Sequence, residues 1–158
     1  MMARTLGIDP GSRYTGYGIV EAEGSRLHLL GSGVIRLPAA VPFHQRLGRI
    51  YQELTAIIGR AQPDSVAIEE VFFAKNVKSA LRLGEARGAA LLAGINCGLA
   101  IHEYPALQIK QAIVGYGRAG KDQVIQMIQY LFKVQDLVDS HAADALAAAV
   151  CHLNTVSS

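Results

Sequence analysis

Short apolar runs open this chain in close succession, whereas helical patterns separate the later ones, and this order constrains the fold more than any other feature. Hairpin turns join antiparallel strands, and helical crossovers join parallel ones. Apolar spacing predicts strands over residues 5–9, 15–22, 27–35, 65–71 and 99–104, and helices over 42–61, 76–97, 106–114, 121–132 and 139–153. We therefore expect an α/β fold with a five-stranded mixed sheet, antiparallel at its start and parallel afterwards, and helices on both faces.

Length and composition indicate one globular unit. The chain has 158 residues, which predicts a single domain over residues 1–158 with a frayed end. Its 51% apolar and 18% charged residues exclude a disordered chain, and no apolar run reaches the about 20 residues of a membrane span. The first residues show no signal-peptide pattern, so we expect a cytoplasmic protein with no membrane partner. Cys97 and Cys151 lie outside any C-x-x-C motif, which favours two buried thiols over a disulfide.

The charges are unevenly distributed along the chain. Residues 71–121 hold seven lysines and arginines against two glutamates, whereas residues 122–158 hold one lysine against four aspartates. A nuclease needs both kinds of segment, because cations hold phosphates while carboxylates hold metal ions. A solvated helix face gives the same pattern, so charge alone does not decide between the two.

Acidic residues stand where strands end. Asp9 closes the first predicted strand, the Glu69-Glu70 pair closes the fourth, and His141 and Asp144 share one face of the last helix. Sites in open α/β sheets form at the carboxyl ends of strands, so neighbouring first and fourth strands would bring these groups together. Each has a simpler interpretation as a turn, strand-end or surface residue. Because adjacent strand residues face opposite ways, the spacing leaves open which glutamate faces the site.

Gathered carboxylates point to a metal ion. They repel one another unless a cation neutralises them, and Mg²⁺ prefers oxygen ligands. Two such ions about 3.5–4 Å apart can serve a phosphodiester displacement, with one activating water and the other stabilising the leaving oxygen.

Several motifs, in order and at matching spacing, resemble the RuvC family of Holliday-junction resolvases. They are LGIDPGS at residues 6–12, TGYG at 15–18, AIEEVFFAKN at 67–76, LGEARG at 83–88, IKQAIVG at 109–115 and AADALA at 142–147. The resemblance covers nearly the whole chain and implies a ribonuclease H-like fold. It also implies a homodimer that nicks two like-polarity strands of a four-way DNA junction symmetrically, in homologous recombination and DNA repair. Expected products carry 5′-phosphate and 3′-hydroxyl ends, and the expected protein partner is the RuvA–RuvB branch-migration complex.

The resemblance assigns the candidate metal ligands. Asp9, Glu69 and Asp144 match the family's metal-binding acids, which implies two Mg²⁺ ions per site, with Mn²⁺ as a substitute. His141 stands where many members have Asp, and we treat it as a further catalytic and metal-binding candidate. Imidazole is a better ligand for manganese than for magnesium, and it can also orient water or a phosphate oxygen.

Further residues are expected to hold DNA and a second copy of the chain. Lys110 and Lys121 match lysines near the scissile phosphate, and Phe72 is the expected base contact beside Phe73. The other candidate DNA contacts are Lys75, Asn76, Arg82 and Arg118. Ala80, Gly84 and Gly88 form a small-residue stripe that is expected to lie at the dimer interface, although packing on the chain's own sheet would also explain it.

Three other functions remain compatible with these residues. Actin-like ATPases share the strand–Asp–x–Gly opening, but they need two such domains around the nucleotide. A non-catalytic junction-binding module would explain His141. A related nuclease that cuts structured RNA would use the same carboxylates.

Overall fold

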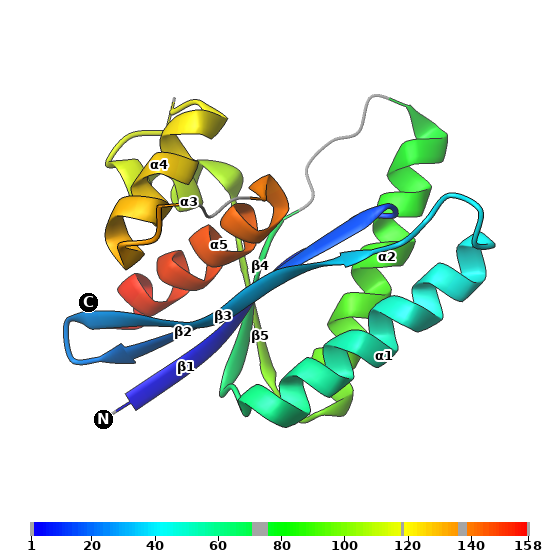
Figure 1. Cartoon of the computed structure of the whole chain (residues 1–158), viewed down its shortest axis with the longest axis horizontal. Helices are drawn as coiled ribbons and strands as arrows, with labels where there is room; N and C mark the ends of the chain where they lie inside the picture. Colours follow the sequence, from blue (N-terminus) through cyan, green and yellow to red (C-terminus); the bar gives the residue numbers. More distant parts are fainter. Residues whose placement is uncertain (1, 71–75, 118, 136–138, 158) are drawn as a thin grey trace.

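A five-stranded mixed sheet forms the centre of the computed structural model, which describes residues 2–70, 76–117, 119–135 and 139–157 (Figure 1). The strands are β1 (Met2–Asp9), β2 (Tyr14–Glu23), β3 (Arg26–Arg36), β4 (Ser65–Glu69) and β5 (Ala100–Tyr104). They lie in the order β3-β2-β1-β4-β5. The β1–β2 and β2–β3 pairs are antiparallel, and the β1–β4 and β4–β5 pairs are parallel. The predicted fold class is confirmed.

Helices cover both faces of the sheet, as Figure 1 shows. They are α1 (Phe43–Ala61), α2 (Val77–Asn96), α3 (Ala106–Val114), α4 (Lys121–Phe132) and α5 (Ser140–Val156). One apolar core lies between the sheet and α1 with α2, and the other lies between the sheet and α3, α4 and α5. Strand β1 begins at Met2, earlier than predicted, and β4 ends at Glu69. The other elements begin and end close to their predicted positions.

Helix α5 lies directly on the backbone of the sheet. From Ala142 to Leu153 nearly every residue is buried, and most of these residues are alanines. A Cβ atom added to Gly7 would overlap the carbonyl oxygen of Ala145, and one added to Gly16 would overlap the carbonyl oxygen of His141. This close approach requires glycine on the sheet, and it fixes the start of α5 over the carboxyl end of β1.

Strand register decides which acidic side chains face α5. Asp9 pairs with Gly16, so both lie on the face that α5 covers. Gly7 pairs with Ala67 of β4, and Ala67 is buried in the α5 core. Because alternate residues of a strand share a face, Glu69 also belongs to the α5 face. The strand register thus shows that Glu69 lies on the α5 face, a choice between Glu69 and Glu70 that the sequence left open.

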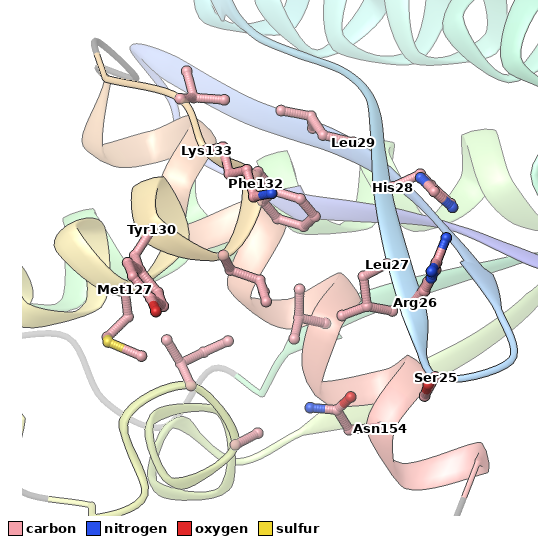
Figure 2. A pocket seen from close by; sticks show the side chains of 15 residues that line it. Ser25, Arg26, Leu27, His28, Leu29, Met127, Tyr130, Phe132, Lys133 and Asn154 are labelled. Carbon is pink, nitrogen blue, oxygen red and sulfur yellow. The ribbon is translucent and has the colours of Figure 1, made fainter.

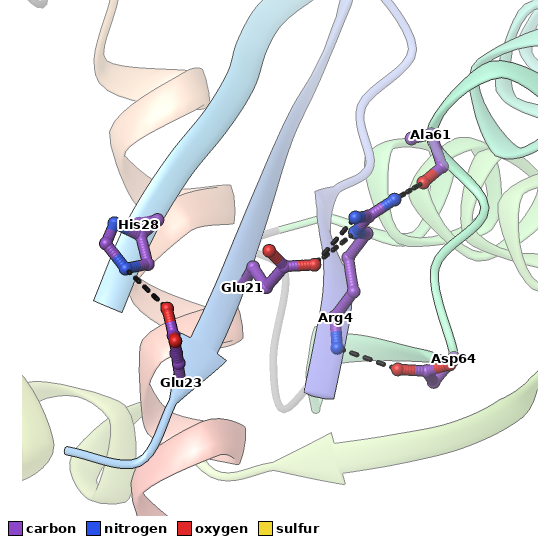
Figure 3. A network of polar contacts seen from close by, with 6 residues as sticks. All are labelled: Arg4, Glu21, Glu23, His28, Ala61 and Asp64. Carbon is purple, nitrogen blue, oxygen red and sulfur yellow. Dashed lines mark hydrogen bonds and ion pairs between the residues drawn. The ribbon is translucent and has the colours of Figure 1, made fainter. Parts of the chain in front are cut away.

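Arg4 stabilises the other end of the sheet (Figure 3). Its guanidinium donates to Glu21 Oε2 from Nε at 2.9 Å and from Nη2 at 2.6 Å, and to the Ala61 carbonyl. Its backbone N–H donates to Asp64 Oδ2 at 2.8 Å. These contacts join β1 to β2, to the last residue of α1 and to the segment after it, away from the carboxyl ends of the parallel strands.

The cysteines are both free thiols, as predicted, but only one is buried. Cys151 lies in the buried part of α5, whereas Cys97 is exposed. The prediction for Cys97 is wrong because α2 ends at Asn96 and leaves Cys97 as its C-cap. None of the helices in the described residues is long and apolar enough to span a membrane.

The contact between α5 and the sheet predicts a large cost for one added methyl group. We expect Gly7→Ala to lower the free energy of unfolding by about 3 kcal/mol, because backbone has to move away from the new Cβ. The matched control is Gly48→Ala at an exposed position of helix α1, where the Cβ meets no atom within 4 Å. That change should raise stability by about 0.5–1 kcal/mol. Urea unfolding of both variants measures the difference, and equal effects would show that α5 does not need Gly7.

Candidate active site

Six of the predicted site residues meet around the carboxyl ends of β1 and β4. Asp9 and Glu69 come from these two strands, and His141 and Asp144 come from the first turns of α5. Lys110 of α3 and Lys121 of α4 complete the group. Asp144 and Lys121 interact with both Asp9 and Glu69, while His141 contacts Asp9 and Lys110 interacts with Glu69.

Asp9 and His141 are in direct contact. The Nδ1 atom of His141 lies 3.1 Å from Asp9 Oδ2. The backbone N–H of His141 donates to Asp139 Oδ1 at 2.7 Å, so Asp139 caps α5. The start of the helix is therefore fixed by its cap while the imidazole is turned toward the end of β1.

Glu69 and Asp144 share a small cavity with the two lysines. Its volume is about 220 Å³, and both carboxylates line it with Lys110 and Lys121. Lys121 Nζ lies 3.3 Å from Asp144 Oδ2. The cavity combines cations with carboxylates, which suits a phosphate group held beside a charged site.

The carboxylates are crowded enough to change their protonation. Burial and the charge of Asp144 raise the pKa of Asp9 from its usual 3.8 to about 6, and the hydrogen bond from His141 opposes this rise. Burial and the charge of Asp144 also raise the pKa of Glu69, against the charges of Lys110 and Lys121. The fold thus gathers more negative charge here than the neighbouring cations neutralise.

A divalent ion suits this set of donors. Among the described residues, no group of three or more His, Cys, Asp or Glu side chains is close enough to hold a metal ion in the present arrangement. Three carboxylates and an imidazole are nevertheless the donors that such an ion takes, and their mutual repulsion favours added positive charge. In the structure, Lys121 supplies part of that charge by pairing with Asp144. The residues present therefore fit a divalent metal.

Apart from Lys110 and Lys121, the predicted DNA contacts have local roles or lie outside the described residues. The Arg82 guanidinium lies 4.8 Å from the centre of the Phe43 ring and so joins α2 to α1. Asn76 caps α2 by accepting the Ser79 N–H at 2.8 Å. Phe72, Phe73, Lys75 and Arg118 all lie outside the described residues.

The small-residue stripe of α2 does not pack on the chain's own sheet. Ala80 and Gly84 are exposed, and a Cβ added to Gly84 or Gly88 meets no atom within 4 Å. Helix α2 instead buries its other face through Ala86, Ala90, Ala93 and Gly94. Packing on the sheet therefore does not explain the stripe, and its place at a dimer interface stays a prediction.

Sequence reasoning missed Tyr14, the first residue of β2. Its ring stacks on the His141 imidazole, with ring centres 5.4 Å apart and planes 19° apart. The guanidinium of Arg36 lies 5.8 Å from the centre of the same ring. The available signal was the position of Tyr14 two residues before Gly16, which gives both the same face as Asp9 once the strands are paired.

A larger cavity lies elsewhere, between the β2–β3 hairpin and helices α4 and α5 (Figure 2). Its volume is about 1000 Å³, and its lining includes Leu27, His28, Tyr130 and Lys133. No candidate catalytic residue lines it. The candidate site is therefore distinguished by its chemistry and not by the size of its cavity.

The raised pKa of Asp9 predicts that this residue lowers stability at neutral pH. The folded state binds the Asp9 proton more tightly than the unfolded state does. Protonation of Asp9 therefore stabilises the fold below pH 4, and this stabilisation is lost as the pH rises through about 6. We expect Asp9→Asn, measured in EDTA, to raise the free energy of unfolding by on the order of 1–3 kcal/mol at pH 7.

The control for this prediction is the pH itself. At pH 4 the two proteins should unfold at nearly the same urea concentration, because most of the Asp9 carboxyl is then protonated in the folded protein. Equal stability at pH 7 would contradict the crowding of charge described above.

Comparison with known proteins assigns the family. The family model for the crossover junction endodeoxyribonuclease RuvC matches residues 5–152. The curated RuvC proteins of Geobacter metallireducens and Geotalea uraniireducens are 51% and 53% identical to this chain, over 96% of it and 93% and 89% of their own lengths.

A solved structure agrees with this assignment. Thermus thermophilus RuvC in complex with a Holliday junction superposes with a TM-score of 0.92 at 34% identity, covering 98% of this chain and 95% of that one. Membership of this nuclease family implies dependence on a divalent metal, which the donors of the site fit. With its sequence and its fold in agreement, this chain belongs to the RuvC family of crossover junction endodeoxyribonucleases.

Proposed function

We propose that this chain resolves four-way DNA junctions by nicking two strands of like polarity at symmetric positions. As a RuvC-family protein it is an endodeoxyribonuclease that acts on Holliday junctions in recombination and repair. The observation that carries the finer proposal is the grouping of Asp9, Glu69, His141 and Asp144 beside two lysines at one end of the sheet. The actin-like ATPase alternative is set aside by the family assignment.

The four donors are proposed to hold two Mg²⁺ ions, for which Mn²⁺ can substitute. When bound, the ions supply an activated water and stabilise the leaving oxygen. Water attacks phosphorus, the bond to the 3′ oxygen breaks and that oxygen takes up a proton. The phosphate stays on the 5′ end of the other product. These are the ligatable ends that resolution of a junction requires.

The lysines and α5 prepare the site for a phosphate. Lys121 pairs with Asp144 in the structure, and its ammonium becomes available to a phosphate oxygen once Asp144 is neutralised by another cation. Lys110 lines the same cavity from α3 and is proposed as a second phosphate contact. The hydrogen bond to Asp9 is proposed to orient the His141 ring. The other ring nitrogen, Nε2, would then bind a ligand or a water molecule.

Other residues are proposed to hold the junction and the dimer. Phe72 would stack on a base at the crossover, with Phe73 beside it, and phosphates would be held by Lys75, Asn76, Arg82 and Arg118. A second copy is proposed to pack on α2 along Ala80, Gly84 and Gly88, beside the 61% exposed Leu81. Two active sites would then face two symmetric strands of the junction. We place the protein in the cytoplasm, in association with RuvA–RuvB.

The two adjacent glutamates provide a matched test of the proposed catalytic set. A labelled four-way junction with a mobile, thymine-rich core should receive paired symmetric nicks with Mg²⁺ or Mn²⁺. Glu69→Gln and Asp9→Asn should each lower the cleavage rate at least about 100-fold, because each removes a charged ligand from the site. Glu70→Gln should cut normally, since Glu70 follows the end of β4, is exposed and does not line the cavity of Glu69 and Asp144.

Controls separate the alternatives. A linear duplex should remain uncut, and a four-way RNA junction tests the RNA nuclease alternative. Tight junction binding without nicking in either metal would identify a binding module instead. Equal loss of activity in the two glutamine variants would refute the assignment of Glu69.

The imidazole of His141 should influence which metal works best. We expect His141→Asp to lower the ratio of the Mn²⁺-supported rate to the Mg²⁺-supported rate several-fold, about 3- to 10-fold, because a carboxylate suits magnesium better. Single-turnover cleavage in each metal measures this ratio. An unchanged ratio would remove His141 from the metal-binding set while leaving the three carboxylates in place.

A further inference from the structure

An aromatic side chain covers the imidazole of the site. The Tyr14 ring stacks on His141 at 5.4 Å between centres and 19° between planes, in an offset arrangement that aromatic rings prefer. Tyr14 as a whole residue is 37% exposed and the side chain of His141 is 36% exposed, so neither side chain is held by burial alone. The position of the imidazole therefore depends on its specific contacts.

The other contacts of His141 leave one rotation of its imidazole ring unrestrained. Its backbone is fixed by the Asp139 cap and by the close approach of its carbonyl to Gly16. The hydrogen bond to Asp9 sets the direction of Nδ1. A single hydrogen bond allows the ring to swing about the line that joins its two atoms, whereas a stacked ring opposes that motion.

Tyr14 is itself held in place by strand pairing. It stands opposite Arg36 in the β2–β3 register, and the Arg36 guanidinium lies 5.8 Å from the centre of its ring. A cation near an aromatic ring is attracted by the charge distribution of the ring. Arg36, Tyr14 and His141 thus form a row of contacts that runs from β3 through β2 to α5.

We infer that Tyr14 is a positioning residue for His141: its ring fixes the plane of the imidazole, so that Nδ1 stays on Asp9 and Nε2 stays directed at a ligand or water. Nothing in this role requires the tyrosine hydroxyl. The inference rests on the proposed function for its consequence in catalysis, but the placement of the imidazole can be measured without metal or DNA.

The first test is a spectrum of the metal-free protein. The ring protons of His141, assigned by their absence in His141→Gln, should carry an upfield shift from the Tyr14 ring. Tyr14→Ala should abolish that shift and broaden the signals as the imidazole samples more orientations, whereas Tyr14→Phe should preserve both position and sharpness. Identical His141 signals in wild type and Tyr14→Ala would overturn the inference.

The second test is a double-mutant cycle on junction cleavage. Tyr14→Ala should lower kcat about 3- to 10-fold with little change in KM, which is the size of effect that one aromatic contact gives. Tyr14→Phe should restore most of the rate, and Tyr14→Ala should have no further effect in a His141→Ala background. Equal losses in the two backgrounds would show that Tyr14 does not act through His141.

The control variant is Tyr130→Ala, which removes an 80% exposed tyrosine of α4 and should cut normally. If the wild-type protein cuts no junction, the proposed function fails, and the spectrum alone decides whether Tyr14 positions His141. If Asp9→Asn abolishes cleavage while Tyr14→Ala cuts like wild type, the inference fails and the proposed function stands.

Discussion

The contact between helix α5 and the glycines of β1 and β2 is the interaction on which the rest of the structure depends. Backbone meets backbone at Gly7 and Gly16, and alanines let α5 lie this close over most of its length. The same contact gives α5 its core, because close packing maximises the dispersion contacts of small side chains. It also sets the height of His141 and Asp144 above the end of β1. The same contact therefore determines both the packing of α5 and the geometry of the site.

That packing offsets an electrostatic cost. Asp9, Glu69 and Asp144 would separate if they were free to do so, since their charges repel and two of them have raised pKa values. They cannot separate because two are attached to paired strands and the third to a buried helix. The fold thus maintains a local excess of negative charge, which is the condition that a divalent ion relieves. Lys121 reduces the excess through its pairing with Asp144 at 3.3 Å, and His141 Nδ1 contacts Asp9 Oδ2 at 3.1 Å.

The order of elements could be predicted because it depends on local pattern. Apolar spacing and turn residues located the strands and helices, and the way consecutive strands are connected determined which pairs are parallel. The choice between Glu69 and Glu70 could not be derived from spacing, because it depends on the register of β4 against β1. Tyr14 was missed for a similar reason: its partners are Arg36, on the neighbouring strand β3, and His141, far along the chain. The exposure of Cys97 depends on where α2 stops, which is the least predictable part of a helix.

The first turn of α5 also brings a charge that no side chain supplies. The aligned peptide dipoles of a helix are equivalent to about half a positive elementary charge at its N-terminus. Asp139 caps this terminus, and His141, in the first turn, contacts Asp9. The positive end of α5 therefore lies beside the carboxylates, where its dipole favours negative charge. Moving α5 by one turn along its axis would shift this end by about 5 Å. The sheet would lose a fixed positive potential together with the side chains of α5.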